Sequence, residues 1–352
     1  MEDILSDTNI LEYESLSSPA EVIASLPPNE TVRQTVLVAR QTIKNILDGN
    51  DKRKLMIVGP CSIHDVDAGL DYARKLVVLA GEVKDSVYIV MRTYLEKPRS
   101  TVGWKGLLYD PDLNDSLDIE KGILVGRKFL LDVNGLGLPC ANEFVRTGLP
   151  QYTADLTSWA AIGARTVESQ THRELASGLS MPVGLKNNTA GDISSAVDAC
   201  VASRSSHTFL GLTMDGKNCT VRTKGNKYGH IVLRGANGKP NYYPEKVAGA
   251  ISLLTSAGLP LNIIIDCSHA NCAKIAGRQE EISYNILQQI KDGNSVIKGI
   301  MLESNIHGEN QPFPKTLEQI KNLKYGVSVT DPCLDFESTE RIVRKWAEEL
   351  RK

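Results

Sequence analysis

The sequence predicts an α/β protein built as a closed barrel of eight parallel strands surrounded by helices. Three observations lead to this prediction. Eight short apolar runs recur along the 352 residues, almost every run ends in a residue able to bind an anion or a metal, and helical patterns alternate with the runs. Strands that turn polar only at their carboxyl ends suit a closed parallel barrel, because its chemistry sits at that rim.

The strands are expected to begin near residues 55, 87, 138, 159, 182, 230, 262 and 298. Eight strands close a barrel without an exposed edge. The helical stretches between them fall near residues 66–82, 118–135, 151–157, 168–179, 192–203, 244–257, 277–292 and 337–350. Strict alternation of this kind indicates parallel strands joined by right-handed crossovers.

Two segments lie outside the repeating pattern. Residues 1–28 are predicted to form an arm. A helix that begins after Asn29 and ends at Gly49 is predicted to serve as a barrel plug or a subunit contact. We therefore divide the chain into an arm and helix (1–50) and a catalytic barrel (51–352). Within the barrel, the turn signal Asp215-Gly216 lies between two strand-like runs. It predicts an inserted hairpin over about residues 205–228, before the sixth barrel strand.

An open doubly wound sheet is the alternative fold. It is disfavoured because the turn after the first strand, Gly59-Pro60-Cys61-Ser62, lacks the glycines that cradle a phosphate.

Composition narrows the functional classes. Forty Lys and Arg stand against 42 Asp and Glu, which argues against nucleic acid as a partner. The sequence has no run of about 18 apolar residues, so no membrane span is predicted. Its acidic start lacks the charged-then-apolar layout of a signal peptide. Seven cysteines without a CxxC pair are typical of free thiols in a cytoplasmic protein.

A set of cations falls at or just after the predicted strand ends. Any one of them could form an ordinary surface ion pair, but in a barrel they converge on one cavity. Two like charges about 4 Å apart repel by roughly 4 kcal/mol at an effective dielectric near 20, so such a cavity demands anionic ligands. The set is Arg92, Lys97, Arg99, Arg165, Lys186 and Arg234, with Lys105 as a weaker member.

Four potential metal ligands come from the first, seventh and eighth strands and the segment just beyond them. These strands are neighbours only in a closed barrel. A thiolate, an imidazole and two carboxylates suit Mn²⁺, Fe²⁺, Co²⁺ or Zn²⁺ better than Mg²⁺. Spacing alone leaves simple packing as an alternative for Cys61, His269, Glu303 and Asp331.

Several ordered motifs then resemble one family, 3-deoxy-D-arabino-heptulosonate 7-phosphate (DAHP) synthase of the microbial type I feedback-regulated class. The likeness covers residues of about 15 to 350. The motifs are residues 59–65 (GPCSIHD), 97–100 (KPRS), 103–106 (GWKG), 161–166 (AIGART), 168–170 (ESQ), 266–271 (DCSHAN) and 328–331 (SVTD).

The resemblance implies a (β/α)8 TIM barrel enzyme that condenses phosphoenolpyruvate with erythrose 4-phosphate in the shikimate pathway. It implies one divalent metal, with Mn²⁺ favoured, held by Cys61, His269, Glu303 and Asp331. Lys97 would act as a proton donor. Phosphoenolpyruvate contacts would be Arg92, Lys97, Arg165, Lys186 and Arg234 beside Glu143, and erythrose 4-phosphate contacts Arg99 and Ser100.

The resemblance also implies feedback inhibition by an aromatic amino acid and a homodimer or homotetramer. Gly211 favours tyrosine as the effector over phenylalanine or tryptophan. The matching positions of the inhibitor pocket are Asp7, Pro150, Gln151, Leu175, Leu179, Ser180, Phe209, Gly211 and Val221.

Some positions depart from the family pattern, namely Arg146, Asn188, Ala190 and the pair Gly308-Glu309. A disulfide between Cys61 and Cys333 in metal-free protein is a further hypothesis. Two rival functions stay open: an octulosonate 8-phosphate synthase using arabinose 5-phosphate, and a sensor of aromatic amino acids that has lost turnover.

Overall fold

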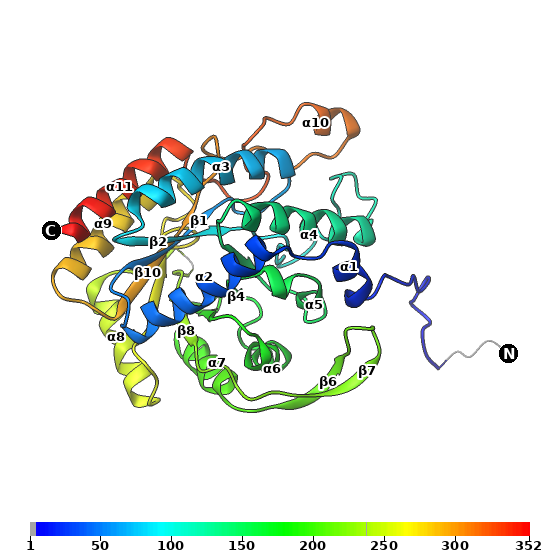
Figure 1. The fold of residues 1–352 in the computed structure, drawn as a ribbon, viewed down its shortest axis with the longest axis horizontal. Helices are drawn as coiled ribbons and strands as arrows, with labels where there is room; N and C mark the ends of the chain where they lie inside the picture. The colour runs from blue at the N-terminus through cyan, green and yellow to red at the C-terminus, as the bar shows by residue number, and fades with distance from the viewer. Residues whose placement is uncertain (1–4, 237) are drawn as a thin grey trace.

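A computed structural model describes residues 5–236 and 238–352, and its central feature is a closed parallel barrel (Figure 1). Neighbouring strands follow the order β1-β10-β9-β8-β5-β4-β3-β2 around the barrel. The predicted (β/α)8 TIM barrel is therefore confirmed. Its strands are β1 Lys54–Gly59, β2 Val87–Arg92, β3 Cys140–Glu143, β4 Trp159–Ile162, β5 Val183–Lys186, β8 Gly229–Leu233, β9 Ile263–Asp266 and β10 Ile297–Glu303.

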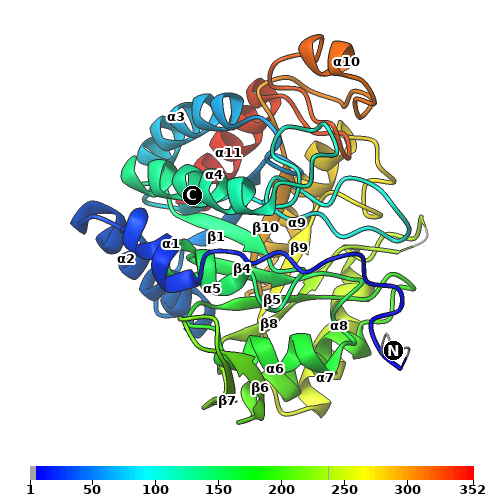
Figure 2. The ribbon, with the colours of Figure 1, turned by 90° about the vertical axis from the view of Figure 1, so that its right-hand side faces the viewer.

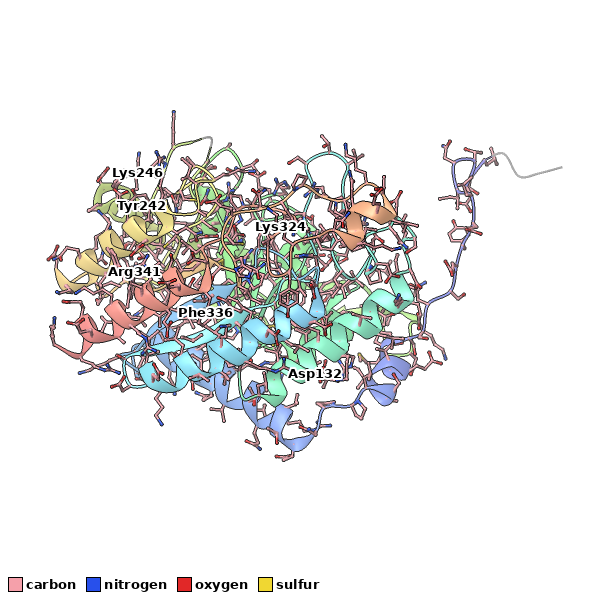
Figure 3. The ribbon with its side chains drawn as sticks, turned by 90° about the horizontal axis from the view of Figure 1, so that it is seen from above. Asp132, Tyr242, Lys246, Lys324, Phe336 and Arg341 are labelled. Atoms are coloured by element: carbon pink, nitrogen blue, oxygen red, sulfur yellow. The ribbon has the colours of Figure 1, made fainter. Side chains whose placement is uncertain are left out.

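Helices surround the barrel close to where the apolar periodicity predicts them. The helix predicted near residues 151–157 is divided into α5 (Pro150–Thr153) and a 3₁₀ turn (Ala154–Leu156). The others are α3 Val66–Val83, α4 Ile119–Gly135, α6 Gln170–Gly178, α7 Ser194–Arg204, α8 Pro244–Ser256, α9 Arg278–Lys291 and α11 Phe336–Arg351. Helices α3 and α11 meet through one aromatic pair: Tyr72 on α3 packs edge to face against Phe336 on α11, with ring centroids 5.4 Å apart. Phe336 is labelled in Figure 3.

Helix α2 (Glu30–Asp48) packs against the core of the barrel. Asn29 caps its start through a hydrogen bond from the Val32 amide, and Gly49 ends it in the left-handed conformation with φ of 79°. Three side chains of its buried face, Ile43, Ile46 and Leu47, join the cluster formed by the inward-facing strand residues. The expectation of a plug is thus confirmed.

Two short helices were not predicted. Helix α1 (Pro19–Ser25) lies within the expected arm and begins with a reciprocal capping box between Ser18 and Glu21. Helix α10 (Leu317–Lys321) lies in the long connection after β10. Neither contains enough turns for an apolar period to be recognised in sequence. The division at residue 50 stays a prediction.

Alternation along each strand sorts side chains into two cores. Outward residues pack against the helices, whereas inward residues such as Leu55, Ile57 and Val232 form the barrel interior. Trp159, at the start of β4, is part of that interior. A Cβ at Gly184 would lie 2.3 Å from the Trp159 ring, so glycine at 184 makes room for the indole.

The predicted hairpin is confirmed as β6 (Thr208–Leu212) paired antiparallel with β7 (Asn218–Arg222). It forms its own two-stranded sheet and runs beside α6, apart from the barrel (Figure 1). The N-terminal arm passes along the molecule toward this region (Figure 2). The Ala20 amide of α1 donates to the Met214 carbonyl at the hairpin turn, at 2.9 Å.

Within the described residues, no helix has both the length and the apolar character that crossing a membrane requires.

A buried histidine makes the stability of the barrel depend on pH. The Trp159 indole donates to His230 Nε2 at 3.1 Å, and His230 Nδ1 donates to the Tyr228 carbonyl at 3.0 Å. Burial lowers the pKa of His230 to about 4. Below pH 6.5 the unfolded chain therefore binds a proton that the native state rejects, and stability falls as the pH drops from about 6.5 to about 4.

We expect the free energy of unfolding to fall by about 2 kcal/mol between pH 7.5 and pH 5 because of His230 alone. Urea unfolding of wild type and His230→Gln at both pH values measures the loss, which should shrink in the variant by that amount. His307→Gln changes an exposed histidine and is the control. Equal losses in wild type and His230→Gln would contradict the prediction.

Candidate active site

The candidate site lies at the carboxyl rim of the barrel, where five strands end in inward-facing charged residues. Arg92, Glu143, Lys186, Asp266 and Glu303 each follow the inward alternation of their strand. They lie in or beneath a cavity of about 380 Å³. Among its lining residues are seven cations, Arg92, Lys97, Arg99, Arg165, Lys186, Arg234 and Lys274, against only two carboxylates, Glu143 and Asp331.

Lys186 forms the centre of a buried ion network. Its Nζ donates to Glu143 Oε2 at 3.1 Å and lies 3.7 Å from Asp266 Oδ2. Burial alone would lower the pKa of Lys186, but the Glu143 carboxylate raises it above its ordinary value. A Cβ at Gly163 would lie 2.2 Å from Glu143 Oε1, so a side chain at this position would displace the Glu143 carboxylate.

Arg92 organises the neighbouring side of the cavity. Its guanidinium donates to Glu303 Oε1 at 2.8 Å and to the carbonyls of Pro60 and Cys61 at 3.1 Å. It also stacks over the Tyr94 ring, 3.6 Å from the centroid. These contacts use much of its donor capacity, so Arg92 holds Glu303 and the Cys61 segment in place as well as facing the cavity.

Three of the four predicted metal ligands come together. The ligand atoms of Cys61, Glu303 and Asp331 all lie within 4.8 Å of one another. His269 lies beside this set, with Nε2 3.6 Å from Glu303 Oε1; its Nδ1 is 2.8 Å from the Ser268 hydroxyl, its hydrogen-bond partner, and 2.9 Å from Asp266 Oδ2. A carboxylate on the far nitrogen is the usual way in which a protein orients a metal-binding histidine.

Lys97 reaches the same set from the loop after β2. Its Nζ lies 2.7 Å from Cys61 Sγ. Burial would lower the pKa of Lys97, but the sulfur of Cys61 and the Glu303 carboxylate hold it above its ordinary value. Despite its own partial burial, Asp331 has its pKa lowered to about 2 by nearby cations, Lys97 among them. The group is therefore a close cluster of opposite charges.

The outer part of the cavity carries more exposed cations. Arg165 donates from Nε to the Ser100 hydroxyl at 2.8 Å, which joins the loops after β4 and β2. Arg99 is exposed beside Ser100. Burial lowers the pKa of Arg234, and the positive charge of Arg165 lowers it further. Mutual repulsion of this kind is relieved when an anion binds between the cations.

The sequence-based set differs from this arrangement at three residues. Lys105 does not line the cavity; its ammonium lies over the Tyr109 ring, and its carbonyl accepts from the Lys97 amide at 2.8 Å. Lys274 was missed, although it lines the cavity and pairs with Asp331 at 3.1 Å. Asp266 was noted from the sequence only within the 266–271 motif. Its place after an apolar run was the available signal.

Most of the predicted effector positions gather around the hairpin and α5. Phe209 and Val221 are cross-strand partners, and Gln151 donates to the Leu212 carbonyl at 2.5 Å. A Cβ at Gly211 would lie 2.6 Å from Val221 Cγ2, so Val221 already occupies part of the space that the glycine leaves. Pro150 begins α5, Leu175 lies on α6, and Leu179 and Ser180 follow that helix.

Asp7, the weakest member of that set, lies on the exposed arm. Its carboxylate accepts a hydrogen bond from the Tyr13 hydroxyl at 2.9 Å. This contact is within the arm.

The departures from the family pattern have local consequences. Glu309 adopts φ of 66°, in the left-handed region that glycine occupies most easily, whereas the neighbouring Gly308 does not. Asn188 donates to Glu168 at 2.7 Å and accepts from the Asp192 amide at 2.9 Å, which closes its loop. Cys61 and Cys333 are both free thiols, and Cys333 Sγ lies 3.7 Å from the Asp331 carbonyl.

Comparison with protein-family models matches residues 30–344 to the DAHP synthetase I family. Three relatives from Escherichia coli K12 are named phospho-2-dehydro-3-deoxyheptonate aldolase. The Tyr-sensitive protein is 45% identical over 99% of this chain and 97% of its own length. The Trp-sensitive protein is 48% identical over 95% of this chain and 94% of its own length. The Phe-sensitive protein is 47% identical over 98% of this chain and 97% of its own length.

A solved structure of phospho-2-dehydro-3-deoxyheptonate aldolase from Francisella tularensis SCHU S4 has the same fold. It superposes with a TM-score of 0.94 at 44% identity and covers 97% of this chain and 99% of its own.

Proposed function

We infer that this chain, which belongs to the DAHP synthetase I family, condenses phosphoenolpyruvate with erythrose 4-phosphate to give DAHP and phosphate. The enzyme is a 3-deoxy-7-phosphoheptulonate synthase of the aromatic amino acid pathway, and it is subject to feedback regulation. The observation that carries the inference is one cavity in which seven cations face a cluster of potential metal ligands. Two phosphorylated substrates meet that demand for negative charge.

Phosphoenolpyruvate is proposed to bind in the inner part of the cavity. Lys186 reaches it from a buried position and Lys97 from a half-buried one. Arg165 and Arg234 offer guanidinium groups that repel each other until an anion lies between them. Arginine suits both carboxylate and phosphate oxygens because its donors form a planar fork. Arg92 and Glu143 complete this subsite by holding the charges around it.

Erythrose 4-phosphate is proposed to bind nearer the mouth of the cavity. Arg99 and Ser100 lie there on the exposed end of the loop after β2. The Ser100 hydroxyl bonds Arg165, so the two subsites share one boundary. Lys274 extends the same cationic wall, and we add it to the substrate-binding set in place of Lys105.

A divalent cation is proposed to bind Cys61, Glu303, Asp331 and His269. The donor chemistry fits, since a thiol, two carboxylates and an imidazole favour Mn²⁺, Fe²⁺, Co²⁺ or Zn²⁺. When bound, such an ion supplies Lewis acidity toward the aldehyde oxygen. We favour Mn²⁺.

The chain's own residues then orient the reactants. The enol carbon of phosphoenolpyruvate attacks the aldehyde carbon, water adds to the second carbon, and phosphate leaves. Lys97 remains protonated because its pKa is raised, and its Nζ is placed to give a proton to the developing alkoxide. The surrounding cations hold both phosphates, which converts an encounter of two molecules into a reaction within one site.

Regulation, assembly and location complete the proposal. The named relatives carry three different sensitivities, so family membership alone leaves the effector open. We propose tyrosine as the effector, a homodimer or homotetramer as the assembly, and the cytoplasm as the location.

Arg99→Ala should raise the KM for erythrose 4-phosphate about tenfold to a hundredfold, because a charged hydrogen bond contributes about 1.5–3 kcal/mol. The KM for phosphoenolpyruvate should change little. A phosphate-release assay with Mn²⁺ measures both, and arabinose 5-phosphate in place of erythrose 4-phosphate tests the octulosonate alternative. Arg278→Ala, at the exposed start of α9, is the control. An unchanged KM for erythrose 4-phosphate would remove Arg99 from this role.

Cys61→Ser should weaken Mn²⁺ binding at least tenfold, because a hydroxyl is a far poorer ligand than a thiolate. Isothermal titration with Mn²⁺ alone measures this without any turnover. Cys200→Ser, which changes a buried cysteine on α7, should bind Mn²⁺ as wild type does. If both variants bind equally well, Cys61 is not a ligand.

Tyrosine should bind more tightly than phenylalanine or tryptophan in isothermal titration. Gly211→Ser should weaken tyrosine binding at least threefold, because its Cβ would displace Val221. Leu210→Ser, on the opposite face of β6, should leave binding unchanged. Absence of binding by all three amino acids would refute the regulatory proposal.

A further inference from the structure

Glu96 is a buried carboxylate that the proposed chemistry does not use. It precedes Lys97 in the loop after β2, is only 2% exposed, and does not line the cavity. Burial of an unpaired carboxylate is strongly unfavourable, so its surroundings must compensate for the charge. The contacts of Glu96 indicate what it does.

The carboxylate of Glu96 receives two consecutive backbone amides from a different loop. The Val145 amide donates to Oε2 and the Arg146 amide donates to Oε1, each at 3.1 Å. That loop begins directly after Glu143, the partner of Lys186. A single side chain therefore joins the loop that carries Lys97 to the loop that carries Glu143.

The same segment is held from its other side. His172 at the start of α6 donates from Nε2 to the Val145 carbonyl at 2.8 Å, and its Nδ1 accepts from the Ser169 hydroxyl at 2.9 Å. Ser169 lies in the loop after β4 that carries Arg165. The peptide groups around Val145 thus connect three consecutive strand-end loops of the site.

The ionised form of Glu96 has a counter-charge in Arg146. Burial raises the pKa of Glu96 to about 8, the two amides lower it, Glu143 raises it and the positive charge of Arg146 lowers it. Arg146 occupies a position where the family commonly has an acid, so it stabilises the carboxylate that an acid would repel.

We propose that Glu96 is a positioning residue that sets the distance between Lys97 and the Glu143–Lys186 pair by clamping the Val145 and Arg146 amides. The proposal rests on the proposed function, since it concerns the geometry of that site. A misplacement of about 1 Å at reacting groups is enough to slow a reaction about a hundredfold, so a clamp between loops has kinetic consequences.

Glu96→Gln tests the clamp, because an amide can accept from one N–H while its own NH₂ faces the other donor. We expect kcat to fall at least tenfold and each KM to change less than threefold. Hydrogen exchange at the Val145 and Arg146 amides should accelerate at least tenfold. Glu96→Asp keeps the charge but is one methylene shorter, and it should retain more kcat than Glu96→Gln.

Asp110→Asn is the matched control. Asp110 is also a buried carboxylate that accepts two consecutive amides, from Asn114 and Asp115, but within its own loop. The Asp110→Asn substitution should lower the melting temperature and leave kcat unchanged. All rates and exchange are compared at a pH above 8, where Glu96 is ionised, and well below the melting temperature of each variant.

Wild-type kcat in folded Glu96→Gln, or wild-type exchange at the two amides, would overturn the proposal. If Glu96→Gln does not fold, a wild-type kcat in Glu96→Asp despite accelerated exchange at the two amides has the same meaning. An inactive wild type would instead refute the proposed function, because the exchange of the two amides reports on the clamp independently of turnover.

Discussion

The site depends on the concentration of like charges at one end of a closed barrel. Alternation along each strand directs every second side chain inward, and at the carboxyl rim these inward positions are charged. Buried cations repel strongly where water cannot screen them. The carboxylates of Glu143, Asp266 and Glu303 offset part of this repulsion. Anionic substrates neutralise the positive charge that remains.

The charged rim needs a rigid support, and the lower barrel supplies it. Trp159 on β4 occupies the space that Gly184 leaves on β5, and His230 on β8, the next strand beyond β5, accepts the hydrogen bond of the indole. Helix α2 closes the interior with three aliphatic side chains. A densely packed interior is hardly compressible, so the strand ends and their charged residues are held in fixed positions by the sheet.

The loops form the adaptable part of the site. Glu96 and His172 bind opposite sides of the same peptide segment, and Arg165 bonds Ser100 across the cavity. Helix α6, which begins beside His172, also carries Leu175 of the proposed effector region. The elements around the hairpin are therefore physically continuous with the loops that hold the catalytic groups.

The sequence by itself determined the barrel, the hairpin and most of the charged rim. Apolar runs and strand-end polarity are local patterns, and the closed strand order follows from their number and alternation. Local pattern could not reveal α1 and α10, because each has too few turns to show a period. Side-chain partners likewise depend on residues far apart in the chain. Only the tertiary structure brings Lys274 to Asp331, turns Lys105 toward Tyr109, and aims Glu96 at the backbone of another loop. The physical reason is that periodicity fixes which face a residue occupies, whereas contact between loops is decided by how the closed sheet places their ends.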